Sequence, residues 1–234
     1  AAGSVTIGEG ATAGNINTRG GLVRVEAGAK AGLVSTLGGD IFIRERAAVG
    51  IVSTSEGRVS IDKGASATSV RSESTPIVIG EEVAVAQMVL TRDGDITIGK
   101  GSSVGENVVT QEGLVTIDGA TVKGTVVTTE GGVMVTNGAV LEGGLTVMKL
   151  DEKKPRGILN RSSATPKPPV IVIGPRARVQ GTLEVKGTAR VLVHETAKVE
   201  NVVGTTVEGW SGEEPPVLPK AAEGAGGGPA KLLK

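Results

Sequence analysis

Apolar residues return along this chain about every eighteen residues. Ile7, Val25, Ile43, Ile61 and Ile79 follow one another at that spacing, and the pattern continues past them at intervals of eighteen or nineteen. A second apolar residue stands two positions before each, so apolar and polar residues alternate as they do in a β-strand. A repeat of this length is typical of a solenoid, in which each repeat forms one coil that packs on the next.

Every repeat holds two more apolar positions, separated from the first by Gly-rich stretches. One position is filled by Ala13, Ala31, Val49, Ala67, Val85 and Val104, and the other by Ile16, Val34, Val52, Val70, Val89, Val108 and Val126. Three short strands, each followed by a turn, would close one triangular coil, and successive coils would pair in parallel about 4.8 Å apart. The last two positions lie only about three residues apart, and this unequal spacing favours a right-handed coil. We therefore predict an all-β fold, a single-stranded parallel β-helix (β-solenoid) that is right-handed and triangular, with about ten coils of about 18 residues.

The period also divides the chain into four parts. Residues 1–150 carry eight coils, and residues 170–212 carry two more and a C-terminal cap. Between them, residues 151–169 contain several prolines and many charges, which predict an excursion outside the stack. Residues 213–234 are rich in Pro and Gly and predict a flexible or extended tail.

A column of hydroxyl-bearing residues accompanies the third apolar position. It consists of Thr18, Thr36, Thr54, Ser72, Thr91, Thr110 and Thr128. Each member lies two residues after an inward aliphatic residue, and side chains two apart in a strand share a face. We therefore expect an inward polar ladder whose hydroxyls bond to the corner backbone, as buried hydroxyls must. A threonine ladder on an exposed face suggests ice binding, and the inward direction argues against that function.

Composition excludes several classes of protein. The 25 basic and 25 acidic residues balance, so the chain lacks the electrostatic footprint of a nucleic-acid binder. No apolar stretch is long enough to span a bilayer, and the absence of Cys removes disulfides and thiolate metal sites. With one Phe, one Trp and no Tyr, the chain offers no aromatic platform for sugar rings. We expect no nucleic-acid partner and no membrane span.

Candidate catalytic residues are few. His194 is the only histidine, and its place after Val193 in an alternating strand predicts an exposed, outward ring. A serine nucleophile would need a positioned base, and no second His is present to act as one. Four acidic residues stand at Gly-containing corners, namely Asp40, Asp93, Asp95 and Asp118. They resemble parts of calcium-binding repeats, but the full nine-residue pattern never recurs, so turn chemistry is the better interpretation. We expect no catalytic, cofactor or metal site.

Two segments resemble a known family. IGEGATAGNINTRGGLVRVEAGAKAGLVSTLGG resembles the repeat of bactofilins, a bacterial polymer-forming cytoskeletal family. VIVIGPRARVQGTLEVKGTARVLVHETAKVENVVG resembles the C-terminal part of long bactofilin-like proteins that carry signal sequences. The resemblance implies a right-handed triangular β-helix that polymerises end to end without nucleotide, in a periplasmic or extracellular place, with the cytoplasm as the alternative. It also implies an aromatic polymer contact in the terminal coil, a part that Trp210 would take.

The ends of the stack are the predicted assembly interface. A solenoid has two open ends whose backbone groups need a cap or a partner. Little sequence precedes the first coil, so that coil could stack on the end of another subunit, and head-to-tail contacts generate open filaments. We expect Val5, Ile7, Val202 and Trp210 to take part, with copies of the same chain as the partner and a cell-envelope component as a further one.

The main hypothesis is a non-enzymatic structural protein, a β-solenoid subunit that self-assembles end to end into a filament or an envelope-associated scaffold. The first alternative is a monomeric β-helix that binds a glycan or the cell wall through a flat face. Ice binding and the processing of saccharides are weaker alternatives.

Overall fold

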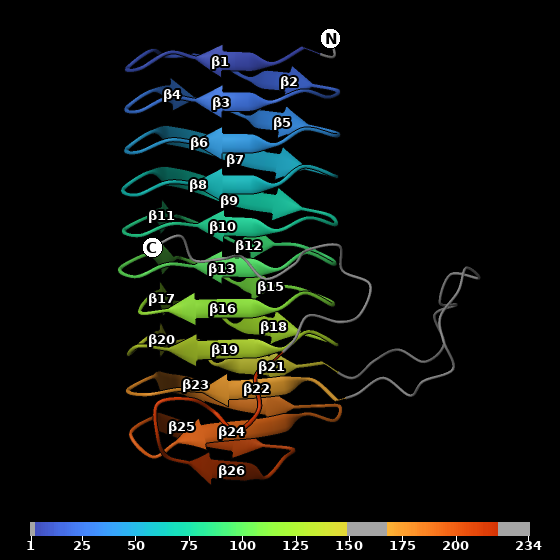
Figure 1. Cartoon of the computed structure of the whole chain (residues 1–234), viewed down its shortest axis with the longest axis vertical. Helices are drawn as coiled ribbons and strands as arrows, with labels where there is room; N and C mark the ends of the chain where they lie inside the picture. The colour runs from blue at the N-terminus through green and yellow to red at the C-terminus, as the bar shows by residue number, and fades with distance from the viewer. Residues whose placement is uncertain (1–2, 149–167, 220–234) are drawn as a thin grey trace, which may run out of the picture.

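The strands of this protein stack into a β-solenoid of about ten coils (Figure 1). The computed structural model describes residues 3–148 and 168–219, and every regular element in these ranges is a β-strand that pairs in parallel with its neighbours. The predicted solenoid is therefore confirmed. The predicted excursion at 151–169 lies outside the described residues except for its last two positions, and so does the part of the predicted tail after residue 219.

One wall of the solenoid is sheet A, to which each coil contributes one strand. The register is constant from coil to coil, as in the pairs Val5↔Val23 and Ile7↔Val25. From the N-terminal end, its eleven strands are β1 (Val5–Ile7), β3 (Val23–Val25), β6 (Ile41–Ile43), β8 (Val59–Ile61), β10 (Ile77–Ile79), β13 (Ile96–Ile98), β16 (Val115–Asp118), β19 (Val133–Thr136), β22 (Val170–Ile173), β24 (Arg190–His194) and β26 (Val207–Trp210).

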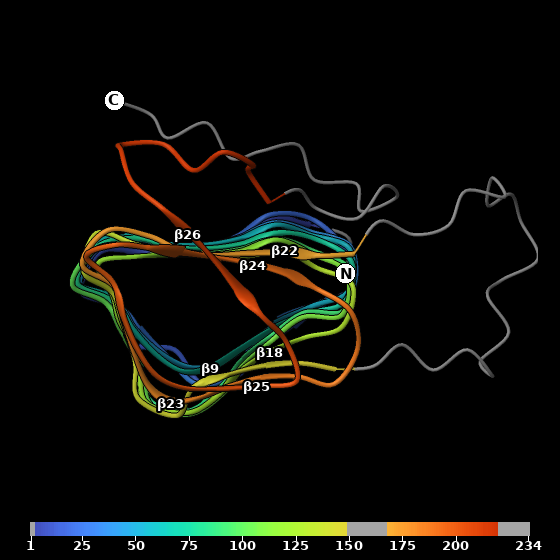
Figure 2. The same ribbon diagram turned by 90° about the horizontal axis from the view of Figure 1, so that it is seen from below.

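The other walls belong to sheet B, which turns a corner, so that the outline seen along the stack is three-sided (Figure 2). Its short strands are β2 (Ile16–Thr18), β4 (Lys30–Ala31), β5 (Val34–Thr36), β11 (Ala84–Val85), β12 (Val89–Leu90), β14 (Ser103–Val104), β15 (Val108–Val109), β17 (Thr121–Val122), β18 (Val126–Thr128), β20 (Val140–Leu141) and β21 (Leu145–Val147). Four longer strands are β7 (Ala48–Thr54), β9 (Ser66–Ser72), β23 (Arg178–Val185) and β25 (Lys198–Val203).

The interior is filled by ladders of small aliphatic side chains. Ile43, Ile61, Ile79 and Ile98 belong to the sheet A ladder, and each is at most 1% exposed. Together with the apolar columns of sheet B they form one cluster that extends through the stack. Each fully buried side chain of this kind contributes about 1.5–3 kcal/mol relative to an exposed one. The branched residues that favour extended strands therefore also supply the core.

After β26 the chain turns back along the outer face of sheet A (Figure 2). We call residues 211–219 the strap. Val217 of the strap packs on an apolar cluster that includes Leu192. Pro219 lies over Gly132, where an added Cβ would come within 2.6 Å of the proline ring, so only glycine leaves room there. The described part of the predicted tail is thus packed on the solenoid.

Candidate functional site: the two ends of the solenoid

The lateral surface carries paired charges. Arg44 and Asp62 of neighbouring coils form an ion pair of 3.0 Å. Lys63 lies 3.0 Å from Glu82 and 3.3 Å from Glu81, and hydrogen bonds to these carboxylates raise the pKa of Lys63. Over residues 3–148 and 168–219, no three His, Cys, Asp or Glu side chains are grouped so that they could hold a metal ion.

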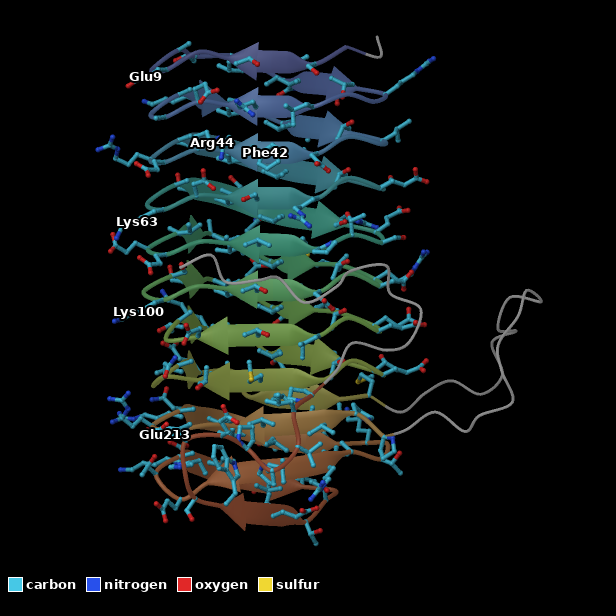
Figure 3. The ribbon with its side chains drawn as sticks, viewed as in Figure 1. Glu9, Phe42, Arg44, Lys63, Lys100 and Glu213 are labelled. Atoms are coloured by element: carbon cyan, nitrogen blue, oxygen red, sulfur yellow. The ribbon has the colours of Figure 1, made fainter. Side chains whose placement is uncertain are left out.

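The outer faces carry no stacked aromatic rings in the described residues. The Phe42 ring lies on the outside of sheet A, with the Arg44 guanidinium 5.1 Å from its centroid (Figure 3). A shallow groove on sheet B is lined mainly by small side chains, among them Ser66, Ala84 and Ser103, with Lys123 as its charged group.

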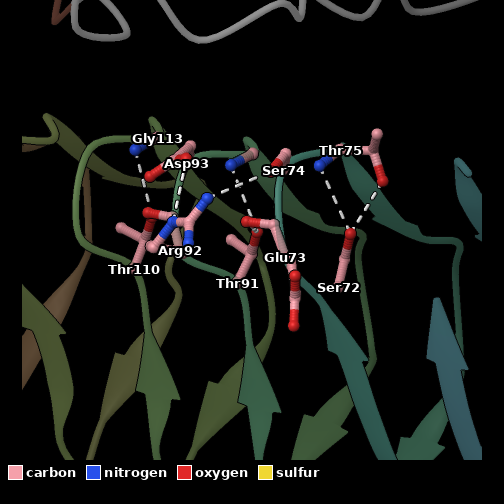
Figure 4. A network of polar contacts seen from close by, with 10 residues as sticks. Ser72, Glu73, Ser74, Thr75, Thr91, Arg92, Asp93, Thr110 and Gly113 are labelled. Carbon is pink, nitrogen blue, oxygen red and sulfur yellow. Dashed lines mark hydrogen bonds and ion pairs between the residues drawn. The ribbon is translucent and has the colours of Figure 1, made fainter. Parts of the chain in front are cut away.

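The predicted hydroxyl ladder lies inside the solenoid. Thr18 in the first coil is partly exposed. The other members are each at most 2% exposed, namely Thr36, Thr54, Ser72, Thr91, Thr110 and Thr128. The hydroxyls of Thr91 and Thr110 accept hydrogen bonds from the backbone N–H groups of Gly94 (3.1 Å) and Gly113 (3.0 Å). Figure 4 shows this arrangement repeating along the corner. The ladder therefore holds the corner backbone and presents no threonine face to solvent.

Three of the four corner aspartates, Asp40, Asp95 and Asp118, join consecutive coils. Oδ1 of Asp40 accepts the N–H of Arg58 at 2.9 Å, and Oδ1 of Asp95 accepts the N–H of Leu114 at 2.8 Å. Burial raises the pKa of Asp95, and the bond from the Leu114 N–H opposes that shift. The other two aspartates contact side chains, Asp93 that of Arg92 and Asp118 that of Asn137. These contacts are those of turns.

His194 is buried, so the prediction of an exposed ring is wrong. Its side chain points away from the interior, but only 7% of the residue is exposed because the Trp210 ring stands edge-on to it at a centroid distance of 4.5 Å. Nδ1 accepts the N–H of Thr196 at 3.1 Å, which places the ring proton on Nε2, 3.2 Å from the carbonyl oxygen of Gly212. The ring therefore fastens the start of the strap to β24.

The N-terminal end of the stack is open in the described structure. Val5 and Ile7 point into the interior and pack on the core cluster, yet both are only partly buried. Within residues 3–148 and 168–219, no strand pairs with the outer edge of β1 or β2. Their unpaired N–H and C=O groups and the half-covered aliphatic side chains form a surface of the kind that pairs with another strand.

The C-terminal end is covered on one wall and open on another. β26 pairs with β24 and crosses the end of the solenoid obliquely (Figure 2). β25 pairs with β23, and its other edge has no partner strand in the described ranges. Val202 is partly buried, whereas Val203 and Val207 are 45% and 46% exposed. Apolar side chains and unpaired backbone thus occur at both ends.

Trp210 has a different place from the one that the resemblance implied. Its side chain lies on the outer face of sheet A in a cluster with Leu192, and the residue is 8% exposed. The ring is not displayed at the end of the stack, because the residue is paired in register with His194. The local sequence did not reveal the strap, although Gly209 interrupts the V-x-I pattern and was an available sign that the last strand is unusual.

Comparison with protein-family models, with curated proteins and with solved structures finds no significant match to this chain. In the part of the chain that the structure describes, no helix is long and apolar enough to cross a membrane.

Proposed function

We propose that this protein is a non-enzymatic structural protein, a β-solenoid rod whose copies associate end to end into a filament or an envelope-associated scaffold. The proposal draws on the resemblance of its repeats to those of bactofilins. We extend it to a periplasmic or extracellular setting, which rests on the resemblance of the coils at residues 170–204 to those of exported relatives of that family.

One observation carries the proposal: within the described residues, the outer edges of β1 and β2 have no partner strand, and Val5 and Ile7 are only partly buried. A solenoid coil has the same outline as its neighbour, so the best partner for an open coil is another coil of the same shape. A second copy provides such a coil at its own end. A contact between unlike ends propagates into an open polymer.

The lateral surface supports the proposal by what its residues do. Arg44 pairs with Asp62 and Lys63 pairs with two glutamates of the next coil, the hydroxyl ladder is internal, and His194 holds the strap. These groups stabilise the rod, and none of them lines the groove described above on sheet B.

Sedimentation velocity over a wide range of concentrations, with electron microscopy of the same samples, tests the proposal. We expect concentration-dependent rods longer than one subunit. Ile7→Asp should weaken this association about tenfold or more, because it places a charge in the contact and desolvating a charge is costly. Thr6→Asp is the matched control, since Thr6 is exposed on the outer side of the same strand.

A strictly monomeric wild-type protein at the highest concentration would contradict the proposal. So would equal effects of Ile7→Asp and Thr6→Asp on association, with both variants shown to be folded by circular dichroism.

A further inference from the structure

β26 is a poor match for the strand on which it lies. It pairs with β24 so that Val207 is opposite Val191 and Gly209 is opposite Val193. Residues opposite one another in parallel strands share a face, so Gly209 stands where an inward side chain belongs. In all ten preceding strands of sheet A that position is Ile or Val. The last strand therefore leaves one place of the core ladder unfilled.

Burial reflects this mismatch. Val193 remains partly exposed, Val207 is 46% exposed, and an added Cβ at Gly209 would meet nothing within 4 Å. The Trp210 indole Nε1 is buried without a hydrogen-bond partner among the described residues, which disfavours the present place of the ring. β26 thus covers β24 without completing a coil.

β26 is held by its pairing with β24, in which the Glu195 N–H donates to the Trp210 carbonyl at 3.0 Å, and by contacts of its outer side chains. Arg190 and Glu208 form an ion pair of 2.6 Å, and the bond from Arg190 lowers the pKa of Glu208. Both side chains are well exposed, so solvent screening leaves this pair only a small contribution to holding the strand. The other side-chain contacts at this end are the Trp210–His194 ring contact, which involves the last residue of β26, and the bond from His194 to Gly212 at the start of the strap. Removal of the Trp210 ring should therefore loosen the end of β26 as well as the strap.

The neighbouring edge of β25 carries the same kind of residue that binds a following coil elsewhere in the stack. Oδ1 of Asn15 accepts the N–H of Leu33, and Oδ1 of Asn107 accepts the N–H of Thr125, in each case from the equivalent position of the next coil. Asn201 occupies the same position in the last coil, and its Nδ2 donates back to the preceding coil. An asparagine Oδ1 at this position is the acceptor that a following coil would use in the same way.

The spacing of the two apolar residues at the sheet B corner is the same in the first coil and the last coil. Ala13 and Ile16 in the first coil are three residues apart, as are Val199 and Val202 in the last. In the coil directly beneath the last, the equivalent residues are four apart, and β23 and β25 pair with a register shift there. A first coil would therefore stack on β25 in register, without such a shift.

We infer that β26 is a displaceable plug that occupies the place of another copy's first strand, so that copies join head to tail when β1 of one replaces β26 of the next. This inference rests on the proposed function and adds its polarity and its control. In the joint, Val5 lies opposite Val191 and Ile7 opposite Val193. Ile7 fills the inward place that Gly209 leaves empty, and the N–H of Asn15 is donated to Oδ1 of Asn201.

Two variants of the full chain should change the stability of β26 on β24 in opposite senses. Gly209→Val adds the missing inward side chain and should weaken association about tenfold, because the plug then competes better with β1. Trp210→Ala loosens the plug and should strengthen association to a similar degree. Leu218→Ala is the control, since Leu218 belongs to the strap but is 58% exposed. Sedimentation velocity measures all three against wild type.

Cysteine cross-linking tests the polarity, because the chain has no cysteine of its own. Thr12 and Lys198 are both exposed and occupy equivalent positions of the first and last coils. Neighbouring parallel strands bring such positions within the 4.4–6.8 Å that a disulfide requires. A mixture of Thr12→Cys and Lys198→Cys chains should form a mixed disulfide, whereas Thr12→Cys alone should not link to itself.

Trp210 is the sole tryptophan, so its fluorescence should shift to the red as association displaces β26. Suppose that wild type associates and that Ile7→Asp abolishes the association. If Gly209→Val then has no effect, or if Thr12→Cys links to itself, the inference that β26 is a plug is overturned and the proposed function stands. If no variant associates, including Trp210→Ala, both are overturned.

Discussion

At the scale of single residues, the hydroxyl ladder shows that one pattern can include unequal members. Thr110 accepts the N–H of Gly113, whereas the buried Oγ1 of Thr36 has no hydrogen-bond partner in the described structure. The same column holds Val147 and Val185 in later coils, where both are buried. The methyl group can pack in every coil, and the hydroxyl contributes where a corner N–H or C=O lies within hydrogen-bond distance, as the Gly131 carbonyl does for Thr128.

Thr110→Val should therefore lower the free energy of unfolding by about 1–3 kcal/mol, because it leaves the Gly113 N–H buried and unpaired. Thr36→Val keeps the shape and removes a hydroxyl that has no partner, so it should be neutral or slightly stabilising. Chemical denaturation of the two variants beside wild type measures this difference. Equal losses in both would show that the hydroxyls act in some other way.

Asp95 is the residue at which pH should matter. Its pKa is raised in the folded protein by burial, so the folded state favours the protonated carboxyl. The stability that this group contributes is fully present below its unfolded pKa of about 3.9 and is lost as pH rises through the higher folded value.

Asp95→Asn keeps the oxygen that accepts the Leu114 N–H and has no charge to desolvate. We expect it to be more stable than wild type at pH 7, with the difference shrinking as pH falls to about 4. Thermal melts between pH 3.5 and 7.5 follow the difference. Asp40→Asn, at the same place of an earlier coil but exposed, should gain less; a gain for Asp95→Asn that did not vary with pH would contradict the assignment.

At the scale of elements, each sheet A strand has an inner and an outer face, and pairing with the neighbouring strands fixes which residues lie on each face. In β10, Ile77 and Ile79 are inward and at most 1% exposed, while Val78 between them is outward and half-buried. A shift of one residue would put two isoleucines outside, so the stack selects one register.

Ile79→Asp should cost about 3 kcal/mol or more, because it buries a charge in an aliphatic ladder without a partner. Val78→Asp introduces the same chemical change in the same strand with the carboxylate at the surface, and it should cost much less. Melting temperatures of the two variants compare the faces directly. Similar losses would mean that the strand does not distinguish them.

At the scale of the whole molecule, every coil contacts chiefly the coils above and below it. Paired strands are about one coil apart in sequence, and one continuous core cluster extends through the stack. Stability in such a structure depends on repeats and their interfaces with neighbours. The two terminal coils have one interface each, so they are the least stabilised.

Hydrogen exchange followed by mass spectrometry should therefore show the slowest exchange in the middle coils, around β10 to β16. Exchange should be faster in β1 and β2 at one end and in β26 at the other. Conditions that promote association should slow exchange at β1 and β2 selectively. Uniform exchange along the stack would contradict the expectation.

The pattern of residues was sufficient for the coils, because a period of about eighteen with alternating aliphatic residues has no other compact solution than stacking. The same alternation placed the hydroxyl ladder inside, since side chains two apart in a strand share a face. These are local rules, and every coil repeats them.

Only the tertiary structure decided the two ends. The alternation of inward and outward residues predicts that His194 points outward, and its side chain does. Its burial, however, depends on Trp210 and on a strap that returns from beyond the last coil. The place of β26 on β24, the empty inward position at Gly209 and the free edge of β25 arise where the repeat stops. A periodic pattern specifies what each coil does to its neighbours, whereas an end has a neighbour on one side only, and its covering depends on contacts between segments that the period does not relate.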